Sequence, residues 1–152
     1  MGIITNIERL NPLLANRAER FLEYCGEHHI KVMIIETLRR LEVQEAYYAQ
    51  GRKSLEDVNA LRRKAGLDAI SKDENSITIT RSMKSRHLEG FAVDICLVHN
   101  GMLWWDAPKD IWEEFGILAE TFGLSWCPGD YSRQWGNGWN NPHFELMDNF
   151  PC

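Results

Sequence analysis

The segment from Phe91 to Val98 constrains the fold of this chain most, because it is the clearest β-strand in the sequence. Its residues are almost all apolar, and Asn100-Gly101 follows directly after it. This dipeptide strongly favours a two-residue hairpin turn. Met102 to Trp105 is therefore predicted to return beside the first strand in the antiparallel direction.

Asp94 lies inside this strand, on the face that strand alternation also gives to Ala92, Cys96 and Val98. A carboxylate among small and apolar neighbours needs a polar or charged partner, because an unpaired charge is costly to bury. A metal ion is one such partner, and a hydrogen bond at the edge of the sheet is another. This segment alone leaves both interpretations open.

Two histidines lie where they could complete a metal site with Asp94. His87 precedes the strand, with Gly90 between them to allow a sharp turn, and His143 lies between a turn and an apolar segment. Two histidines and one carboxylate leave a fourth coordination position open, which is typical of catalytic rather than structural zinc. The remaining histidines are interpreted as ordinary hydrogen-bonded residues: His28, His29 and His99.

Non-haem iron is the competing metal, because its sites also use two histidines and one carboxylate. That class commonly places the first histidine and the carboxylate only a couple of residues apart, whereas seven positions separate His87 from Asp94. The helical His-Glu-x-x-His zinc motif is absent from the sequence. The sequence therefore predicts one Zn²⁺, held by His87, Asp94 and His143.

Helical and extended segments alternate along the rest of the chain. The predicted helices cover about residues 12–25, 42–50, 55–65 and 108–122, and further strands are predicted over 32–35, 76–80 and 144–147. Residues 124–141 are rich in glycine, tryptophan and asparagine, which indicates a long loop. This order predicts an α+β fold, with a small antiparallel sheet flanked by helices in a single domain that carries the zinc site.

Length and composition limit the classes of protein that fit. The 152 residues suit one domain over 1–152, in which residues 52–75 are predicted to be a surface insertion with a short helix. The net charge of -5 argues against a nucleic-acid partner. No segment is long and apolar enough for membrane insertion, and no signal peptide is evident, so cytoplasmic synthesis is expected. Cys25 and Cys96 are interpreted as small core residues.

Two motifs around the predicted zinc ligands resemble those of the M15 zinc peptidases. They are S-x-H-x-x-G-x-A-x-D from Ser85 to Asp94 and P-H-F-E-L from Pro142 to Leu146. Further similar motifs lie at Arg39 with Gln44, at Gln50-Gly51-Arg52, and at Trp126 with Gly129-Asp130-Tyr131. The family includes phage endolysins that cut L-alanyl-D-glutamate bonds, and D-alanyl-D-alanine carboxypeptidases and dipeptidases. The resemblance covers the chain from about residue 10 onward.

This resemblance implies roles for residues around the zinc. Arg39 would bind substrate or stabilise the developing oxyanion, while a surface salt bridge is the alternative for this residue. Ser85 would support the geometry of the site, and Glu145 matches a family position that supports a metal ligand. Gln44 and Asp130 belong to the same motifs and are predicted to lie around the substrate. Nearby basic residues could attract the carboxylates of a wall peptide: Arg81, Lys84 and Arg86.

Position 140 departs from the family pattern. The family carries an acid three residues before its second histidine ligand, as the general base, and this chain has Asn140 there. Without that proton shuttle, the rate is expected to fall by roughly 10²–10⁴-fold. The asparagine is explained by an engineered change, by a naturally inactive protein, or by another acid such as Asp130 or Glu145 taking the role.

The resemblance predicts a zinc metallopeptidase of the endolysin kind, which hydrolyses the L-Ala-D-Glu bond of the peptidoglycan stem peptide and is weakened or silenced at Asn140. It would act as a monomer on the wall of a phage host, in the periplasm, after release from the cytoplasm. Two other functions stay open. One is a non-catalytic wall-binding module that keeps the zinc, and the other is a D-Ala-D-Ala carboxypeptidase, for which the missing export signal is a difficulty.

Overall fold

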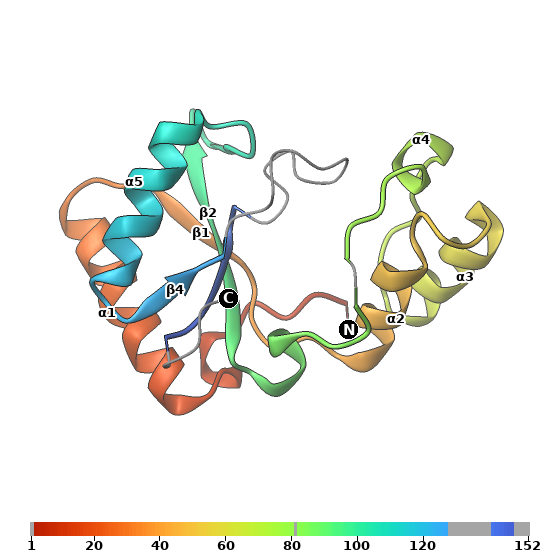
Figure 1. Cartoon of the computed structure of the whole chain (residues 1–152), viewed down its shortest axis with the longest axis horizontal. Coiled ribbons are helices and arrows are strands. Elements are labelled where there is room, and N and C mark those ends of the chain that lie inside the picture. Colours follow the sequence, from red (N-terminus) through yellow and green to blue (C-terminus); the bar gives the residue numbers. More distant parts are fainter. Residues whose placement is uncertain (1, 81, 128–140, 148–152) are drawn as a thin grey trace.

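The chain folds into two groups of elements, which lie on either side of the view in Figure 1. The structure is a computed structural model that describes residues 2–80, 82–127 and 141–147. One group, the sheet half, contains the β-sheet with helices α1 (Pro12–Glu27) and α5 (Lys109–Glu120). The other, the helical half, contains α2 (Leu41–Ala49), α3 (Leu55–Lys64) and α4 (Lys72–Asn75).

The sheet is antiparallel throughout, and its central strand is the one predicted from the sequence. Strands β1 (Val32–Glu36), β2 (Ala92–His99), β5 (His143–Leu146) and β4 (Leu124–Trp126) follow in that spatial order. The short strand β3 (Met102–Leu103) pairs with the end of β2 through the predicted turn, where Asn100 has φ 53° and Gly101 has φ 76°. The α+β prediction, with a small antiparallel sheet flanked by helices, is confirmed.

An aromatic core joins α1 and α5 to the sheet. Phe21 on α1 lies 5.3 Å from Phe115 on α5 and 6.4 Å from Phe144 on β5, measured between ring centroids. Gly116 allows α5 to approach β4, because a Cβ atom there would lie 2.3 Å from the ring of Trp126. Cys25 and Cys96 are buried free cysteines of this core, as predicted.

The helical half is held together differently. Its buried apolar residues are small: Val43, Ala46, Ala49, Val58 and Ala65. Polar side chains link its loops, since Asn59 both accepts from the backbone N–H of Ile70 and donates to the carbonyl of Ile70. The side chain of Ser54 caps α3 by accepting from the N–H of Asp57. Residues 55–75 contain two helices, α3 and α4, where the sequence predicted one.

Three predictions about strands and loops are corrected by the structure. Residues 76–80 form no strand, because side chains rather than a neighbouring strand satisfy their carbonyls: Gln50 donates to Ile77 and Arg52 donates to Thr80. Residues 124–126 form β4, not the start of a loop. The apolar run over residues 32–35 predicts a buried strand, whereas β1 lies at the edge of the sheet and is only partly buried, with Met33 53% exposed.

The start of α1 also matches the prediction. Helix α1 begins after Asn11, whose side chain accepts from the N–H of Leu13, as the Asn-Pro pair predicts. In the described parts of the chain, no helix combines the length and apolar character that crossing a bilayer requires.

Candidate metal centre

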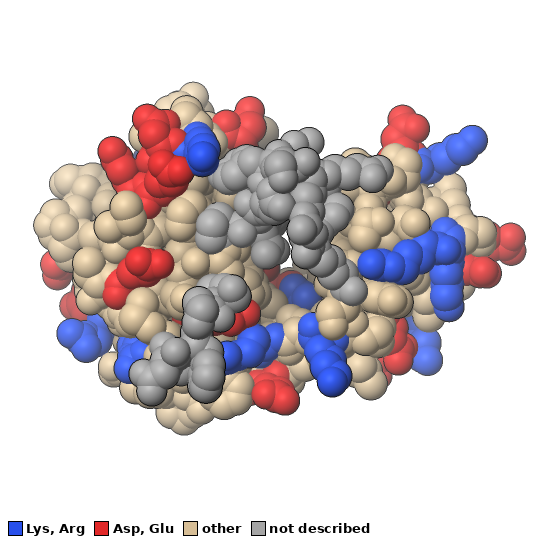
Figure 2. Space-filling model, in the orientation of Figure 1, with Lys and Arg blue, Asp and Glu red and all other residues tan. Residues whose placement is uncertain are grey.

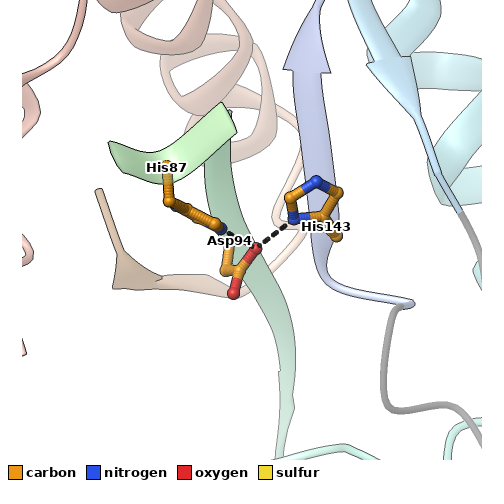
Figure 3. A group of neighbouring side chains, drawn as sticks. All are labelled: His87, Asp94 and His143. Carbon is orange, nitrogen blue, oxygen red and sulfur yellow. Dashed lines mark hydrogen bonds and ion pairs between the residues drawn. The ribbon is translucent and has the colours of Figure 1, made fainter. Parts of the chain in front are cut away.

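Three separate elements of the sheet half bring His87, Asp94 and His143 together (Figure 3). His87 lies on the 3-10 helix η2 (Arg86–Glu89), Asp94 on β2, and His143 at the start of β5. One ligand atom from each lies within 4.8 Å of the other two. The three residues that the sequence nominated as metal ligands are therefore neighbours.

The orientation of His87 is determined by the backbone around it. Ser85 caps η2 by accepting from the N–H of His87, and Gly90 ends η2 with a left-handed φ of 78°. The His87 ring is 1% exposed, and its Nδ1 lies 2.7 Å from the carbonyl oxygen of Thr37. Since a carbonyl only accepts, Nδ1 carries a proton toward Thr37, and Nε2 is the ring nitrogen that faces Asp94.

The register of the sheet places Asp94 between two polar residues. Asp94 pairs with Glu36 on β1, next to an irregularity between Ile34 and Glu36, and with His143 on β5. Directly paired residues of antiparallel strands project from the same face. Glu36, Asp94 and His143 therefore form one polar row across three strands.

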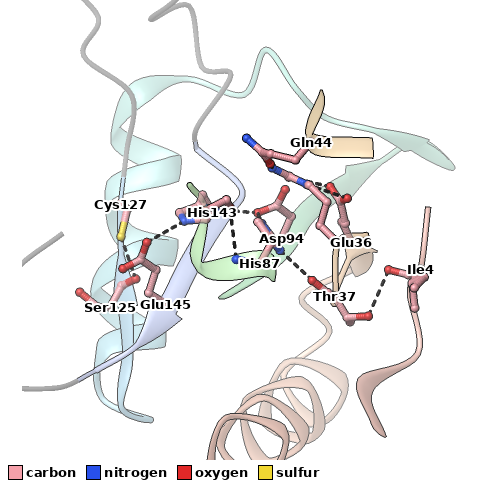
Figure 4. A network of polar contacts seen from close by, with 12 residues as sticks. Ile4, Glu36, Thr37, Gln44, His87, Asp94, Ser125, Cys127, His143 and Glu145 are labelled. Atoms are coloured by element: carbon pink, nitrogen blue, oxygen red, sulfur yellow. Dashed lines mark hydrogen bonds and ion pairs between the residues drawn. The ribbon is translucent and has the colours of Figure 1, made fainter. Parts of the chain in front are cut away.

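Asp94 contacts both histidines of the cluster, and Glu145 contacts the other ring nitrogen of His143. The Oδ1 atom of Asp94 lies 2.9 Å from Nε2 of His87 and 3.0 Å from Nδ1 of His143. The other ring nitrogen of His143, Nε2, lies 3.1 Å from Oε1 of Glu145 (Figure 4). A carboxylate on the second nitrogen of a metal-binding histidine typically fixes its orientation and raises its basicity.

These donors suit zinc. Two imidazoles and one carboxylate are ligands that zinc takes in catalytic sites. The candidate ligand atoms of the three residues all lie within 4.8 Å of one another, so a single ion could be held by all three. A second group of possible ligands, Cys127 with His143 and Glu145, shares a histidine with the first. Cys127 is disulfide-bonded, so its sulfur is not a free thiolate.

The charges of the cluster are strongly coupled. Burial alone would raise the pKa of Asp94, but the charges and hydrogen bonds of His87 and His143 hold it well below its usual value. Burial lowers the pKa of His143, but hydrogen bonds to Asp94 and Glu145 outweigh this and raise the pKa to about 9. Without a metal, Asp94 and His143 therefore form an ion pair at neutral pH.

Arg39 takes part in a buried network beside the row. Its Nε and Nη2 donate to the two carboxylate oxygens of Glu36 at 2.9 and 2.8 Å, and its Nη1 donates to Oε1 of Gln44 at 2.8 Å. Gln44 is fully buried and donates in turn to the carbonyl of Ser82. Arg39 forms a salt bridge with Glu36, but this pair is largely buried and is not the surface salt bridge of the alternative interpretation. Arg39 also lines the cavity next to the cluster.

A cavity of about 590 Å³ opens from the cluster toward the helical half. Residues from both halves line it, including His87, Asp94 and His143 on one side and Ile70, Ile77 and Ile79 on the other. In the space-filling view, Lys and Arg side chains lie along the boundary between the halves (Figure 2). The cluster therefore faces a space large enough for a peptide segment.

Two predicted site residues lie outside the described residues: Asn140 and Asp130. Arg81 lies outside them as well. The structure adds two residues that no sequence pattern singles out. Glu36 holds Arg39, and Thr37 orients His87 while its own N–H donates to the carbonyl of Ile4 at 2.7 Å.

Comparison with known proteins supports the fold. No protein-family model matches the sequence. The structure is similar to the L-Ala D-Glu endopeptidase ChiX of Serratia marcescens, with 18% identity, a TM-score of 0.56, and coverage of 93% of this chain and 84% of that one. It is also similar to a zinc-bound mutant of the VanB-type vancomycin-resistance D,D-pentapeptidase VanY, with 16% identity, a TM-score of 0.53, and coverage of 96% and 77%.

A third similar structure is the LD-carboxypeptidase LdcB, whose structure concerns peptidoglycan recognition, with 11% identity and a TM-score of 0.54. The match covers 91% of this chain and 59% of LdcB. All three neighbours are peptidases by name, and one binds zinc. The chain therefore has a fold that peptidases use.

Proposed function

We propose that the protein is a zinc-dependent peptidase that acts on the peptides of bacterial peptidoglycan. One observation carries the proposal: the donor atoms of His87, Asp94 and His143 converge at the wall of a cavity large enough for a peptide. The names of the structural neighbours support the substrate class, since they include an L-Ala D-Glu endopeptidase and a protein that recognises peptidoglycan.

His87, Asp94 and His143 would hold the zinc, and Glu145 would keep the His143 ring in place. A zinc ion bound there would supply the Lewis acidity that polarises a peptide carbonyl and makes water a better nucleophile. Arg39 would bind the substrate. A guanidinium has five N–H donors, and its described partners use three, which leaves two for a carbonyl or oxyanion in the cavity.

The general base determines how active the enzyme is. Glu145 is a poor candidate, because its hydrogen bond to His143 is the main cause that lowers its pKa, and a carboxylate of lowered pKa is a weaker proton acceptor. Asn140 stands at the position where the M15 zinc peptidases, which this sequence resembles, carry an acid. An asparagine side chain takes up no proton at neutral pH. We therefore expect weak or no turnover, with the L-Ala-D-Glu bond as the proposed target.

Asn140 also favours a second candidate, a wall-binding module that keeps the zinc without cutting. Cleavage of D-Ala-D-Ala is a further alternative within the same fold, because VanY is a D,D-pentapeptidase. As part of the main proposal, the protein acts on the wall after release from the cytoplasm of a phage host.

The test combines metal analysis with digestion of purified cell walls. The wild-type chain should bind one zinc, and His87→Ala should not, whereas His99→Ala at the exposed end of β2 should bind zinc normally. Wild type and Asn140→Asp are then incubated with cell walls, and the released peptides are identified by mass spectrometry. New N-terminal D-glutamate ends, formed at least 100-fold faster by Asn140→Asp, would support the proposal. Wall binding without fragments from either protein would support the binding module instead.

A further inference from the structure

The cavity beside the metal cluster has an apolar wall. Ile70 follows α3, while Ile77 and Ile79 follow α4, and all three are half-buried where they line the space. Two more isoleucines, Ile3 and Ile35, also contribute to the lining. A surface of this kind stabilises methyl and methylene groups, at about 0.8 kcal/mol for each buried CH₂. A substrate that placed only peptide backbone in the cavity would make no use of this apolar wall.

The charged residues that line the cavity differ in whether they already have partners. Among the acids, Glu36 binds Arg39, Asp94 binds both histidines of the cluster, and Glu145 binds His143. The fourth acid is Glu74, next to the isoleucine wall. Within the described residues, no Lys or Arg side chain lies within ion-pair distance of Glu74.

The basic residues that line the cavity also differ in whether they already have partners. Arg39 is paired with Glu36, Arg86 lies 3.9 Å from Glu145, and Arg62 donates to the carbonyl of Asp68. Lys84 lines the cavity close in sequence to the metal-binding segment, and its side chain is exposed. In the part of the chain that the structure describes, no carboxylate lies within ion-pair distance of Lys84.

We propose that the cavity is a subsite for a diamino acid residue of the peptide substrate. The aliphatic stem of that residue lies along Ile70, Ile77 and Ile79, its terminal ammonium meets Glu74, and a substrate carboxylate meets Lys84. An apolar wall and two opposite charges in one cavity are complementary to a side chain with methylene groups and a terminal amine in a peptide that also carries carboxylates. This inference rests on the proposed function and names the substrate feature that the site selects.

Binding of synthetic wall tripeptides tests the subsite independently of turnover. The probes are L-Ala-γ-D-Glu-X, where X is L-lysine, L-norleucine or L-alanine, and calorimetry with the zinc-loaded full chain gives each Kd. Norleucine should bind roughly ten-fold or more tightly than alanine, because it buries three more carbon atoms. Lysine should bind about 2- to 5-fold more tightly than norleucine, since it adds an ion pair at a partly exposed site.

Matched variants separate the contributions. Glu74→Gln should remove the preference for lysine over norleucine, whereas Glu114→Gln, an exposed acid on α5, should leave it intact. Ile77→Ala should reduce the preference for norleucine over alanine, whereas Ile117→Ala, 63% exposed on α5, should not. Lys84→Gln should weaken all three peptides by a similar factor of about 2 to 5.

Each outcome has a defined meaning. Equal affinity of the wild type for all three peptides would overturn the subsite and leave the proposed function standing. Retention of the lysine preference in Glu74→Gln would overturn the assignment of the ammonium to Glu74. Zinc binding without binding of any peptide would overturn the proposed function and the subsite together.

Discussion

The two halves of the molecule are stabilised in different ways. The sheet half buries large aromatic side chains against one another, with Phe21, Trp112 and Phe144 fully buried. The helical half buries mainly alanine and valine and relies on side-chain amides that bind backbone carbonyls. Tight aromatic packing suits the half that carries the proposed metal ligands, which would have to be held within tenths of an ångström. Polar links suit the half that only shapes one wall of the cavity.

Removing a buried aromatic ring should show most clearly that the two halves are stabilised differently. Phe21→Ala is expected to lower the free energy of unfolding by about 3–5 kcal/mol, because it leaves a cavity at the centre of the aromatic core. Val58→Ala, at an equally buried position of α3, should cost only roughly 2 kcal/mol. Urea unfolding of the two variants measures both values. Equal losses would mean that the two halves do not differ in how they are stabilised.

A second substitution tests the polar links of the helical half. Gln50 is buried, and its amide donates to the carbonyls of Glu74 and Ile77. Gln50→Leu should cost about 1–3 kcal/mol, since two carbonyls lose their donor. Hydrogen exchange should accelerate in residues 72–80 while zinc affinity stays unchanged. A matching acceleration in β2 would show that the halves open as one unit.

A substitution beside His143 should lower the zinc affinity of the candidate metal site without disturbing the aromatic core of the sheet half. Glu145→Gln keeps the size of the side chain but removes the charge beside His143, so zinc affinity should fall 10- to 100-fold, or about 1.4–2.7 kcal/mol. Competition with a fluorescent zinc chelator measures the change. The control is Glu120→Gln, at the end of α5. An unchanged affinity would remove Glu145 from the description of the site.

The smallest expected effect is a dependence of stability on pH. The pKa of His143 rises from 6.5 to about 9 on folding, so its ion pair contributes fully below pH 6.5 and is lost as pH rises through 9. Asp94 and Glu145 have lowered pKa values, so their contribution is present above their ordinary pKa values and is lost in acid. Metal-free protein should therefore lose on the order of 1 kcal/mol between pH 7 and 9.

Thermal unfolding in a chelator, compared with unfolding in excess zinc, checks this pH dependence. Zinc requires the neutral imidazole, so the loaded protein should lack the decline. In His143→Gln the metal-free decline should also disappear. If it persists there, another group causes it.

The sequence predicted the sheet half better than the helical half, and the reason is physical. Strand β2 and its hairpin have local signals, an apolar run and an Asn-Gly turn, that packing reinforces. Residues 76–80 alternate like a strand, but pairing needs a free sheet edge nearby. The side chains of Gln50 and Arg52, which follow α2, bind their carbonyls instead. Strand β4 was missed because three residues before a glycine-rich segment carry too little pattern.

The candidate site divides in the same way. His87, Asp94 and His143 could be nominated from residue types, and the structure brings them together. Thr37 contributes a backbone carbonyl, which no side-chain motif reveals. Glu36 reaches the polar row only because the pairing of β1 with β2 shifts just before it. Residues that contribute through a backbone carbonyl or through strand register can be identified only once the assembled sheet is known.

A zinc ion bound at the polar row across β1, β2 and β5 would connect distant segments of the chain in addition to its proposed role in catalysis. His87 and Asp94 are separated by 7 positions, but Asp94 and His143 by 49, and Thr37 holds His87 from 50 positions away. A metal that joins these segments closes long loops of chain and binds only after the strands are in register. At a free zinc concentration 100 times its Kd, this would add about 2.7 kcal/mol to stability. Zinc would then stabilise the folded chain even if the protein, with Asn140 in place of an acid, has no peptidase activity.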